Sequence, residues 1–113
     1  MPQYAVLIFE RVAPADLPAE TMQGHLELPA RIAERGGRTV AGLALERPDT
    51  ATSIRGDLVT DGPFIETKEA LAGVFVIEAR DLDHALALAK MTPIVDGGVE
   101  VRPLIGFEVV EES

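Results

Sequence analysis

The sequence predicts an α+β fold of the ferredoxin-like type, with the element order βαββαβ and an extra hairpin inserted after the second main strand. Three observations lead to this fold class. Residues 4–9 (YAVLIF) and 73–79 (GVFVIEA) are apolar on both faces, as central strands usually are. Residues 18–35 and 82–90 place apolar side chains at helical spacing. Between the two main halves, the pair Gly56-Asp57 is a two-residue hairpin signal.

Length and composition limit the class of protein. The 113 residues are expected to form a single domain over residues 1–113, and 47% of them are hydrophobic, which is enough for a core. The absence of cysteine excludes disulfides, thiolate metal sites and a cysteine nucleophile. The start, MPQYAVLIFE, lacks the features of a signal peptide, and no apolar run approaches the roughly 18 residues of a membrane span. We therefore expect a soluble, cytoplasmic protein.

The formal net charge of −9 bears on possible partners. Nucleic acid and anionic membranes both reward clustered positive charge, so we expect neither as a partner. The simplest role of the negative charge is solubility, and cation binding is the alternative.

The first predicted helix, residues 18–35, lies between the strand at 4–9 and a second strand at 39–45. Gly36-Gly37 ends it, because glycine accepts the left-handed conformation that follows a helix. Pro29 lacks the N–H that would donate to the His25 carbonyl, so we expect a kink or a break near His25. The face expected to pack on the sheet carries Met22, Leu26, Ala30 and Ala33.

The inserted hairpin has a predicted register. Residues 52–55 and 58–61 flank the Gly56-Asp57 turn, and the chain then turns again at Gly62-Pro63. The expected cross-strand pairs are Arg55 with Leu58, Ile54 with Val59, Ser53 with Thr60, and Thr52 with Asp61.

The second half follows the same logic. A helical turn is expected at residues 68–71, before the strand at 73–79. Asp81 is the expected N-cap of the helix at 82–90, and His84 in its first turn is expected on the surface. Residues 99–101 and 106–110 are expected to be extended, as an edge strand or a bend around Pro103. The core stripe expected for the second helix is Leu82, Ala85, Leu86 and Ala89.

Two helices can cover only one face of the predicted sheet. The central strands are apolar on both faces, so the other face needs a cover, and a second copy of the chain is the simplest one. We therefore expect a homodimer.

Residues 58–69 (LVTDGPFIETKE) resemble the signature of the YCII-related, or DGPF-domain, family. Gly42, Gly73-Val74-Phe75, Asp81-Leu82-Asp83 and residues 99–103 (VEVRP) are similar to the family in the same way. The resemblance implies a ferredoxin-like fold, assembly as a dimeric α/β barrel, and a bacterial cytoplasmic protein. Most members have no assigned reaction, and some are encoded near or fused to sigma-factor-like proteins.

In the YCII branch, a histidine and an aspartate in a cleft are thought to be catalytic, which implies His25 and Asp61 as an acid–base pair here. Asp61 has a second interpretation, as an acceptor of N–H groups in its own turn. His25 has the alternative of an ordinary surface or capped position on the helix.

The same motif contributes candidate substrate-binding residues. Phe64 would form a wall of the site, and Lys68 or an arginine would hold a substrate carboxylate. The alternatives are weak solvated ion pairs in the motif and a structural pairing of an arginine with a motif carboxylate. The candidates are Arg55, Phe64, Glu66 and Lys68.

The sequence contains no nucleotide-binding glycine pattern, no HExxH and no serine nucleophile elbow, so we expect no cofactor. Two histidines without cysteine make a zinc site unexpected. Three functions are then compatible with the residues. The protein is a small-molecule enzyme, a ligand-binding or regulatory module that acts through a protein partner, or a scaffold in which the motif locks the hairpin at a dimer interface.

Overall fold

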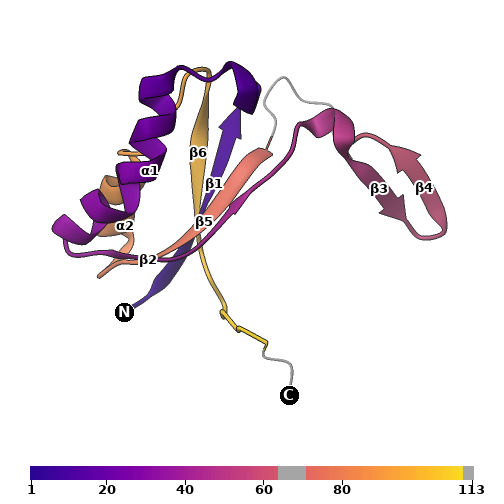
Figure 1. Cartoon of the computed structure of the whole chain (residues 1–113). Coiled ribbons are helices and arrows are strands. Elements are labelled where there is room, and N and C mark those ends of the chain that lie inside the picture. Colours follow the sequence, from indigo (N-terminus) through magenta and orange to yellow (C-terminus); the bar gives the residue numbers. More distant parts are fainter. Residues whose placement is uncertain (64–70, 111–113) are drawn as a thin grey trace.

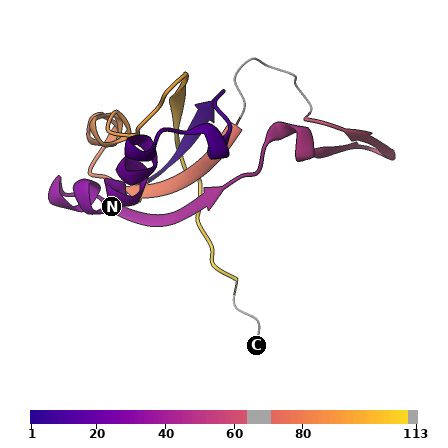
Figure 2. The same ribbon diagram turned by 45° about the horizontal axis from the view of Figure 1, so that its top comes forward.

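The computed structural model describes residues 1–63 and 71–110. Within these residues, an antiparallel sheet carries helices on one face, and a two-stranded hairpin, here called the arm, projects from it (Figures 1 and 2). The mixed α+β class and the predicted order of elements are confirmed. The elements are β1 (Gln3–Glu10), α1 (Ala19–Glu34), β2 (Arg38–Ala44), β3 (Thr52–Arg55), β4 (Leu58–Asp61), β5 (Leu71–Glu78), α2 (Leu82–Ala89) and β6 (Gly97–Pro103), with short 3₁₀ turns η1 (Pro14–Asp16) and η2 (Pro48–Thr50).

The two strands that are apolar on both faces, β1 and β5, lie in the middle of the sheet, whose strand order is β2-β5-β1-β6. Each neighbouring pair is antiparallel. Val6 of β1 faces Phe75 of β5 on one side and Val101 of β6 on the other. Pro103 ends β6 at the edge of the sheet, where a missing N–H costs least. In the described part of the chain, no helix has the length and hydrophobicity needed to cross a membrane.

The core lies between the sheet and the two helices. Val6, Ile32, Ile77 and Leu88 are its largest fully buried side chains. They come from β1, α1, β5 and α2, so the core joins both helices to the two central strands. The four-stranded sheet and its two helices are here called the body. Burying each such side chain contributes about 1.5–3 kcal/mol.

The predicted core face of α1 is wrong. Leu28 and Ile32 are the buried residues, whereas Leu26 is 75% exposed and Met22 also faces outward. Gly24 lies four residues before Leu28 on the buried face, and a Cβ there would come within 2.8 Å of Pro93 Cγ. The absence of a side chain at Gly24 lets the helix approach the loop after α2 on the same face that buries Leu28 and Ile32.

Pro29 does not divide α1. The helix runs unbroken from Ala19 to Glu34, so the predicted break at His25 does not occur. Gly36 adopts φ +83° just after the helix, and the predicted glycine stop is confirmed.

The predicted core stripe of α2 is half right, and the surface position predicted for His84 is wrong. Ala85 and Ala89 are buried as expected, but Leu88 and His84 complete the buried face in place of the exposed Leu82 and Leu86. Asp81 caps the helix as predicted, accepting from the His84 N–H at 2.8 Å.

His84 is buried because two backbone groups satisfy its ring. Nδ1 accepts from the Arg80 N–H at 3.0 Å, which places the ring proton on Nε2, and Nε2 donates to the Arg35 carbonyl at 2.8 Å. Arg35 is the C-terminal cap of α1, where carbonyls lack helical partners. His84 therefore joins the end of α1 to the start of α2.

The arm has the predicted register, from Thr52 opposite Asp61 to Arg55 opposite Leu58. Gly56 and Gly62 adopt positive φ at its two turns, which other residues rarely tolerate. Its base is closed by two hydrogen bonds: the Ser53 hydroxyl donates to the Gly62 carbonyl at 2.6 Å, and the Gly62 N–H donates to the Ala51 carbonyl at 2.7 Å.

The face of the sheet away from the helices, here called the open face, is also apolar. Leu43, Val74 and Leu7 form one row across three strands, and Ala41, Val76 and Ala5 form the next. The β6 members of these rows are Glu100 and Arg102, which place charge at the edge. Leu43 is 66% exposed.

Candidate functional site

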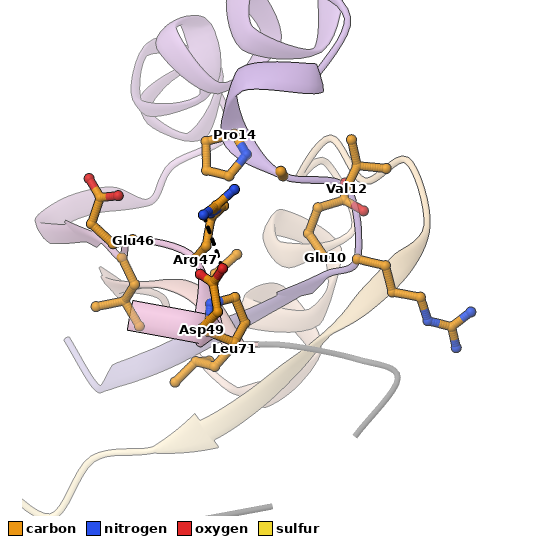
Figure 3. A pocket seen from close by; sticks show the side chains of 12 residues that line it. Glu10, Val12, Pro14, Glu46, Arg47, Asp49 and Leu71 are labelled. Carbon is orange, nitrogen blue, oxygen red and sulfur yellow. Dashed lines mark hydrogen bonds and ion pairs between the residues drawn. The ribbon is translucent and has the colours of Figure 1, made fainter. Parts of the chain in front are cut away.

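A cleft of about 270 Å³ lies at the base of the arm. Three segments that are distant in sequence line it: residues 10–14 after β1, residues 45–49 after β2, and residues 71–72 at the start of β5 (Figure 3). Leu71, the first described residue after the DGPF motif, is therefore part of the wall of the cleft.

Most of the cleft wall is apolar, and Arg47 supplies a cation inside it. Figure 3 shows the Arg47 guanidinium between Pro14 and Asp49, whereas the Glu46 side chain points away. Arg47 Nη2 lies 3.0 Å from Asp49 Oδ2. The apolar lining residues are Val12, Ala13, Pro14, Leu45, Pro48, Leu71 and Ala72.

Local turn chemistry holds Arg47 in this place. Pro48 presets the backbone for η2, and Arg47 is the residue that precedes this turn. The Arg47 carbonyl accepts from the Thr50 N–H at 3.0 Å and from the Thr50 hydroxyl at 2.6 Å. The sequence Arg-Pro-Asp-Thr therefore forms a small closed turn that holds the arginine at the cleft.

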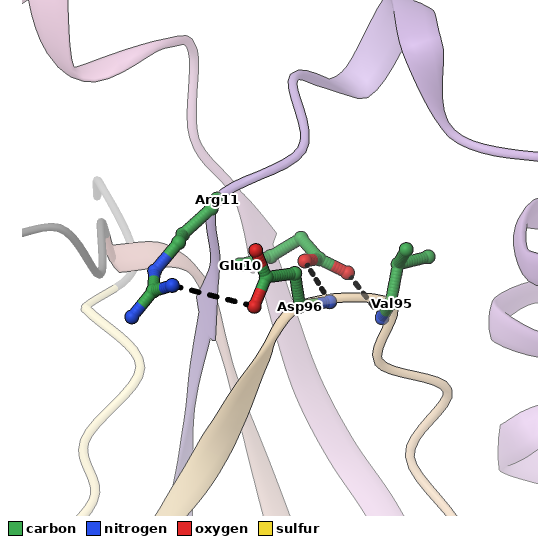
Figure 4. Close-up of polar contacts among 4 residues, drawn as sticks. All are labelled: Glu10, Arg11, Val95 and Asp96. Atoms are coloured by element: carbon green, nitrogen blue, oxygen red, sulfur yellow. Dashed lines mark hydrogen bonds and ion pairs between the residues drawn. The ribbon is translucent and has the colours of Figure 1, made fainter.

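Glu10 is a buried carboxylate at the end of β1 (Figure 4). Its Oε1 accepts from the Val95 N–H at 2.7 Å, and its Oε2 accepts from the Asp96 N–H at 2.8 Å. Burial opposes the charged form, but these and further backbone N–H groups outweigh it, so the pKa of Glu10 is held below its ordinary value of 4.5. Glu10 therefore fastens the loop before β6 to the end of β1.

Arg11 follows Glu10 and binds the same loop. Its N–H donates to the Asp96 carbonyl at 3.0 Å, and its guanidinium Nη1 lies 3.5 Å from Asp96 Oδ1. Figure 4 shows the side chain directed toward Asp96. The charges of Glu10 and Arg11 are thus both engaged by residues 95–96.

The two predicted catalytic residues lie on different parts of the chain. Asp61 ends β4 and is exposed, and its carboxylate has no hydrogen bond to any other described residue. The N–H of Gly62, in the turn that follows, donates to the Ala51 carbonyl. His25 is half-buried on α1.

Figures 1 and 2 show α1 and the arm at opposite ends of the molecule. Within one chain, α1 and the arm do not meet. The acid–base pair of His25 and Asp61 therefore stays a prediction.

Of the remaining candidates, one lies on the arm and the others fall in residues 64–70 of the motif. Arg55 ends β3 at the tip of the arm and is exposed. Phe64, Glu66, Lys68 and most of the helical turn predicted at 68–71 lie outside the described residues. Across residues 1–63 and 71–110, no three His, Asp or Glu side chains are close enough together to hold a metal ion.

The cleft residues Arg47, Asp49 and Glu10 were missed by the sequence analysis. Arg-Pro-Asp-Thr carries a turn signal, but a turn does not reveal which segments surround it. Glu10 could have been noticed because it is a carboxylate at the end of an otherwise apolar strand. A buried carboxylate needs a specific hydrogen-bond partner.

Comparison with known proteins gives the family. Residues 3–108 match the YCII-related domain. A segment of 50 residues is 46% identical to an uncharacterized protein of Rhizobium meliloti (strain 1021), and the match covers 42% of this chain and 40% of that protein. Because the domain match spans nearly the whole chain, this protein belongs to the YCII-related domain family.

Proposed function

We propose that this chain binds a small molecule in the cleft at the base of the arm. The observation that carries the proposal is the cleft itself, which has apolar walls and one inward-facing arginine. Ligand sites generally combine apolar walls with a few polar groups that orient the ligand. At about 270 Å³, the cleft suits a ligand smaller than a typical drug.

We also propose that the chain works as a homodimer of ferredoxin-like subunits that form a dimeric α/β barrel in the bacterial cytoplasm. The strand order and the helices on one face support this arrangement. The apolar rows of the open face support a second copy as its cover, since such a surface is unfavourable in water. The charged edge at Glu100 and Arg102 would lie at the rim of that contact.

Catalysis is the second candidate function, with His25 and Asp61 as acid and base. The observation that favours it is the exposed Asp61 carboxylate, which has no hydrogen bond within the described residues. The arm projects from the rest of its own chain, so a pair with His25 would require the arm of one subunit to reach α1 of the other. A regulatory module that docks a protein partner is the non-catalytic alternative.

A small-molecule screen followed by NMR titration tests the binding proposal. Ligands of this cleft should shift the backbone amides of Val12, Arg47 and Ala72, which belong to its three lining segments. If every hit shifts amides elsewhere and leaves these three unchanged, the cleft is not the site. Analytical ultracentrifugation tests the assembly, and a monomer mass at all concentrations would contradict the dimer.

A further inference from the structure

We propose that the ligand of the cleft is a small organic acid, whose carboxylate binds the Arg47 guanidinium and whose apolar part packs on Val12, Pro14 and Leu71. This inference rests on the proposed function, that the cleft is a ligand site, and it adds the chemical class of the ligand. The charges that line the cleft, and the groups that each one already binds, indicate this class.

Among residues 1–63 and 71–110, five charged side chains line the cleft, but three of them are directed elsewhere. Both oxygens of Glu10 accept backbone N–H groups, and Arg11 is turned toward Asp96. Glu46 points away from the cleft. Within the described part of the chain, the charges left to meet a ligand are those of Arg47 and Asp49.

Arg47 has the capacity to bind a carboxylate while it keeps Asp49. A guanidinium carries five N–H donors in a planar fork, and Asp49 is met by Nη2. Asp49 is the side-chain partner of Arg47 within the described residues, so donors remain for a ligand. A carboxylate matches the fork in a bidentate geometry. The Arg47 side chain is 59% exposed, so solvent screens such a pair and the apolar wall must supply part of the affinity.

Other ligand charges fit less well. An amine would be repelled by Arg47. A phosphate dianion would need more than one cation, and the second arginine of the cleft already binds Asp96. Asp49 competes with a ligand carboxylate for the same guanidinium, so it weakens binding.

The test is a calorimetric and NMR titration of the full chain with acetate, butyrate and hexanoate, alongside the alcohols and amines of equal length. Carboxylate affinity should rise with chain length, because longer chains cover more of the apolar wall. Arg47→Gln should weaken hexanoate binding at least tenfold. Asp49→Asn should strengthen it severalfold, since the competing charge is removed while an oxygen still holds Arg47.

Arg38→Gln is the matched control. Arg38 pairs with Glu78 at 3.0 Å on the other end of β2, so this variant removes the same charge far from the cleft. It should leave hexanoate affinity unchanged. An equal loss in Arg38→Gln and Arg47→Gln would overturn the assignment, because net charge alone would then explain binding.

The outcomes separate the inference from the function on which it rests. If the alcohols or amines shift the cleft amides as strongly as the carboxylates, the organic-acid assignment fails and the ligand cleft stands. If no probe shifts the amides of Val12, Arg47 or Ala72, both the assignment and the proposed site fail.

Discussion

The sheet body and the arm use the same kinds of apolar side chain, but only the body buries them. Val6 and Ile77 are fully buried between the sheet and the helices, whereas Ile54 and Val59 on the arm are 63% and 61% exposed. An isolated two-stranded hairpin is marginally stable in water. The sheet and its helices are therefore stabilised by their own core, whereas the apolar side chains of the arm remain exposed and can pack against another molecule.

Leu88→Ala should have the largest effect on the free energy of unfolding. Leu88 is fully buried in the body, so its truncation leaves a cavity and should cost about 2–5 kcal/mol in urea denaturation. Leu82→Ala on the same helix is the control, because Leu82 is exposed and should cost well under half as much. Equal losses would mean that the body core is not where the structure places it.

Gly97→Ala should follow, with a loss of about 1–3 kcal/mol. Gly97 lies opposite Glu10 in the sheet, and a Cβ there would collide with the Phe9 carbonyl, so backbone must shift. Gly98→Ala is the control, since a Cβ at Gly98 meets nothing within 4 Å. Thermal melting of both variants would show whether the β1–β6 pairing is as close as described.

His84→Ala should cost about 1–3 kcal/mol, because it leaves the Arg80 N–H and the Arg35 carbonyl without their partner. His25→Ala should change stability much less, because His25 is only half-buried on α1 and is not among the buried residues of that helix. The ring of His84 should also show the Nε2–H tautomer by NMR, and the Nδ1–H tautomer would contradict the link between the helices.

Glu10→Gln should lower stability by about 1–2 kcal/mol at neutral pH, because the amide replaces a charged acceptor of backbone N–H groups. The pKa of Glu10 is lowered in the folded protein, so its contribution is present above the unfolded value, near 4.5, and is lost as the pH falls through the folded pKa. The difference between wild type and variant should therefore shrink on acidification below pH 4.5. A difference that is constant with pH would exclude the charge as its cause.

The smallest effect on the body is expected from the double substitution Ile54→Ser, Leu58→Ser on the arm. Both side chains are exposed, so unfolding of the monomer should change by less than about 0.5 kcal/mol. If the arm packs on a second copy, the same variant should weaken the dimer in sedimentation equilibrium. A marked loss of monomer stability would show that the arm belongs to the body's own core.

Signals that are local in sequence were enough to predict the strands, the helices and the turns that connect them. The two-faced apolar runs predicted the central strands, the glycines predicted the turns, and the Gly-Asp pair predicted every cross-strand pair of the arm. These features depend on neighbours in sequence, where backbone sterics and side-chain alternation act directly. The motif also led to the right family.

The packing of the helices and the position of the cleft could not be predicted, because they depend on contacts between residues that are distant in sequence. Helical spacing allowed α1 to bury either Met22 and Leu26 or Leu28 and Ile32. The buried pair lies on the face where Gly24 comes close to Pro93, a contact that the sequence does not reveal. The catalytic pairing of His25 with Asp61 remains a prediction for the same reason, since it depends on how two distant elements meet.

The elements, their order, the register of the arm and the family could all be predicted from local sequence signals. Tertiary structure decided which helix faces are buried, why His84 is internal, and where Arg47 meets the apolar walls of the cleft. The physical reason is the range of the interactions. Turns and strand alternation are satisfied within a few residues, whereas the partners of His84 and the walls around Arg47 come from segments that only the folded chain brings together.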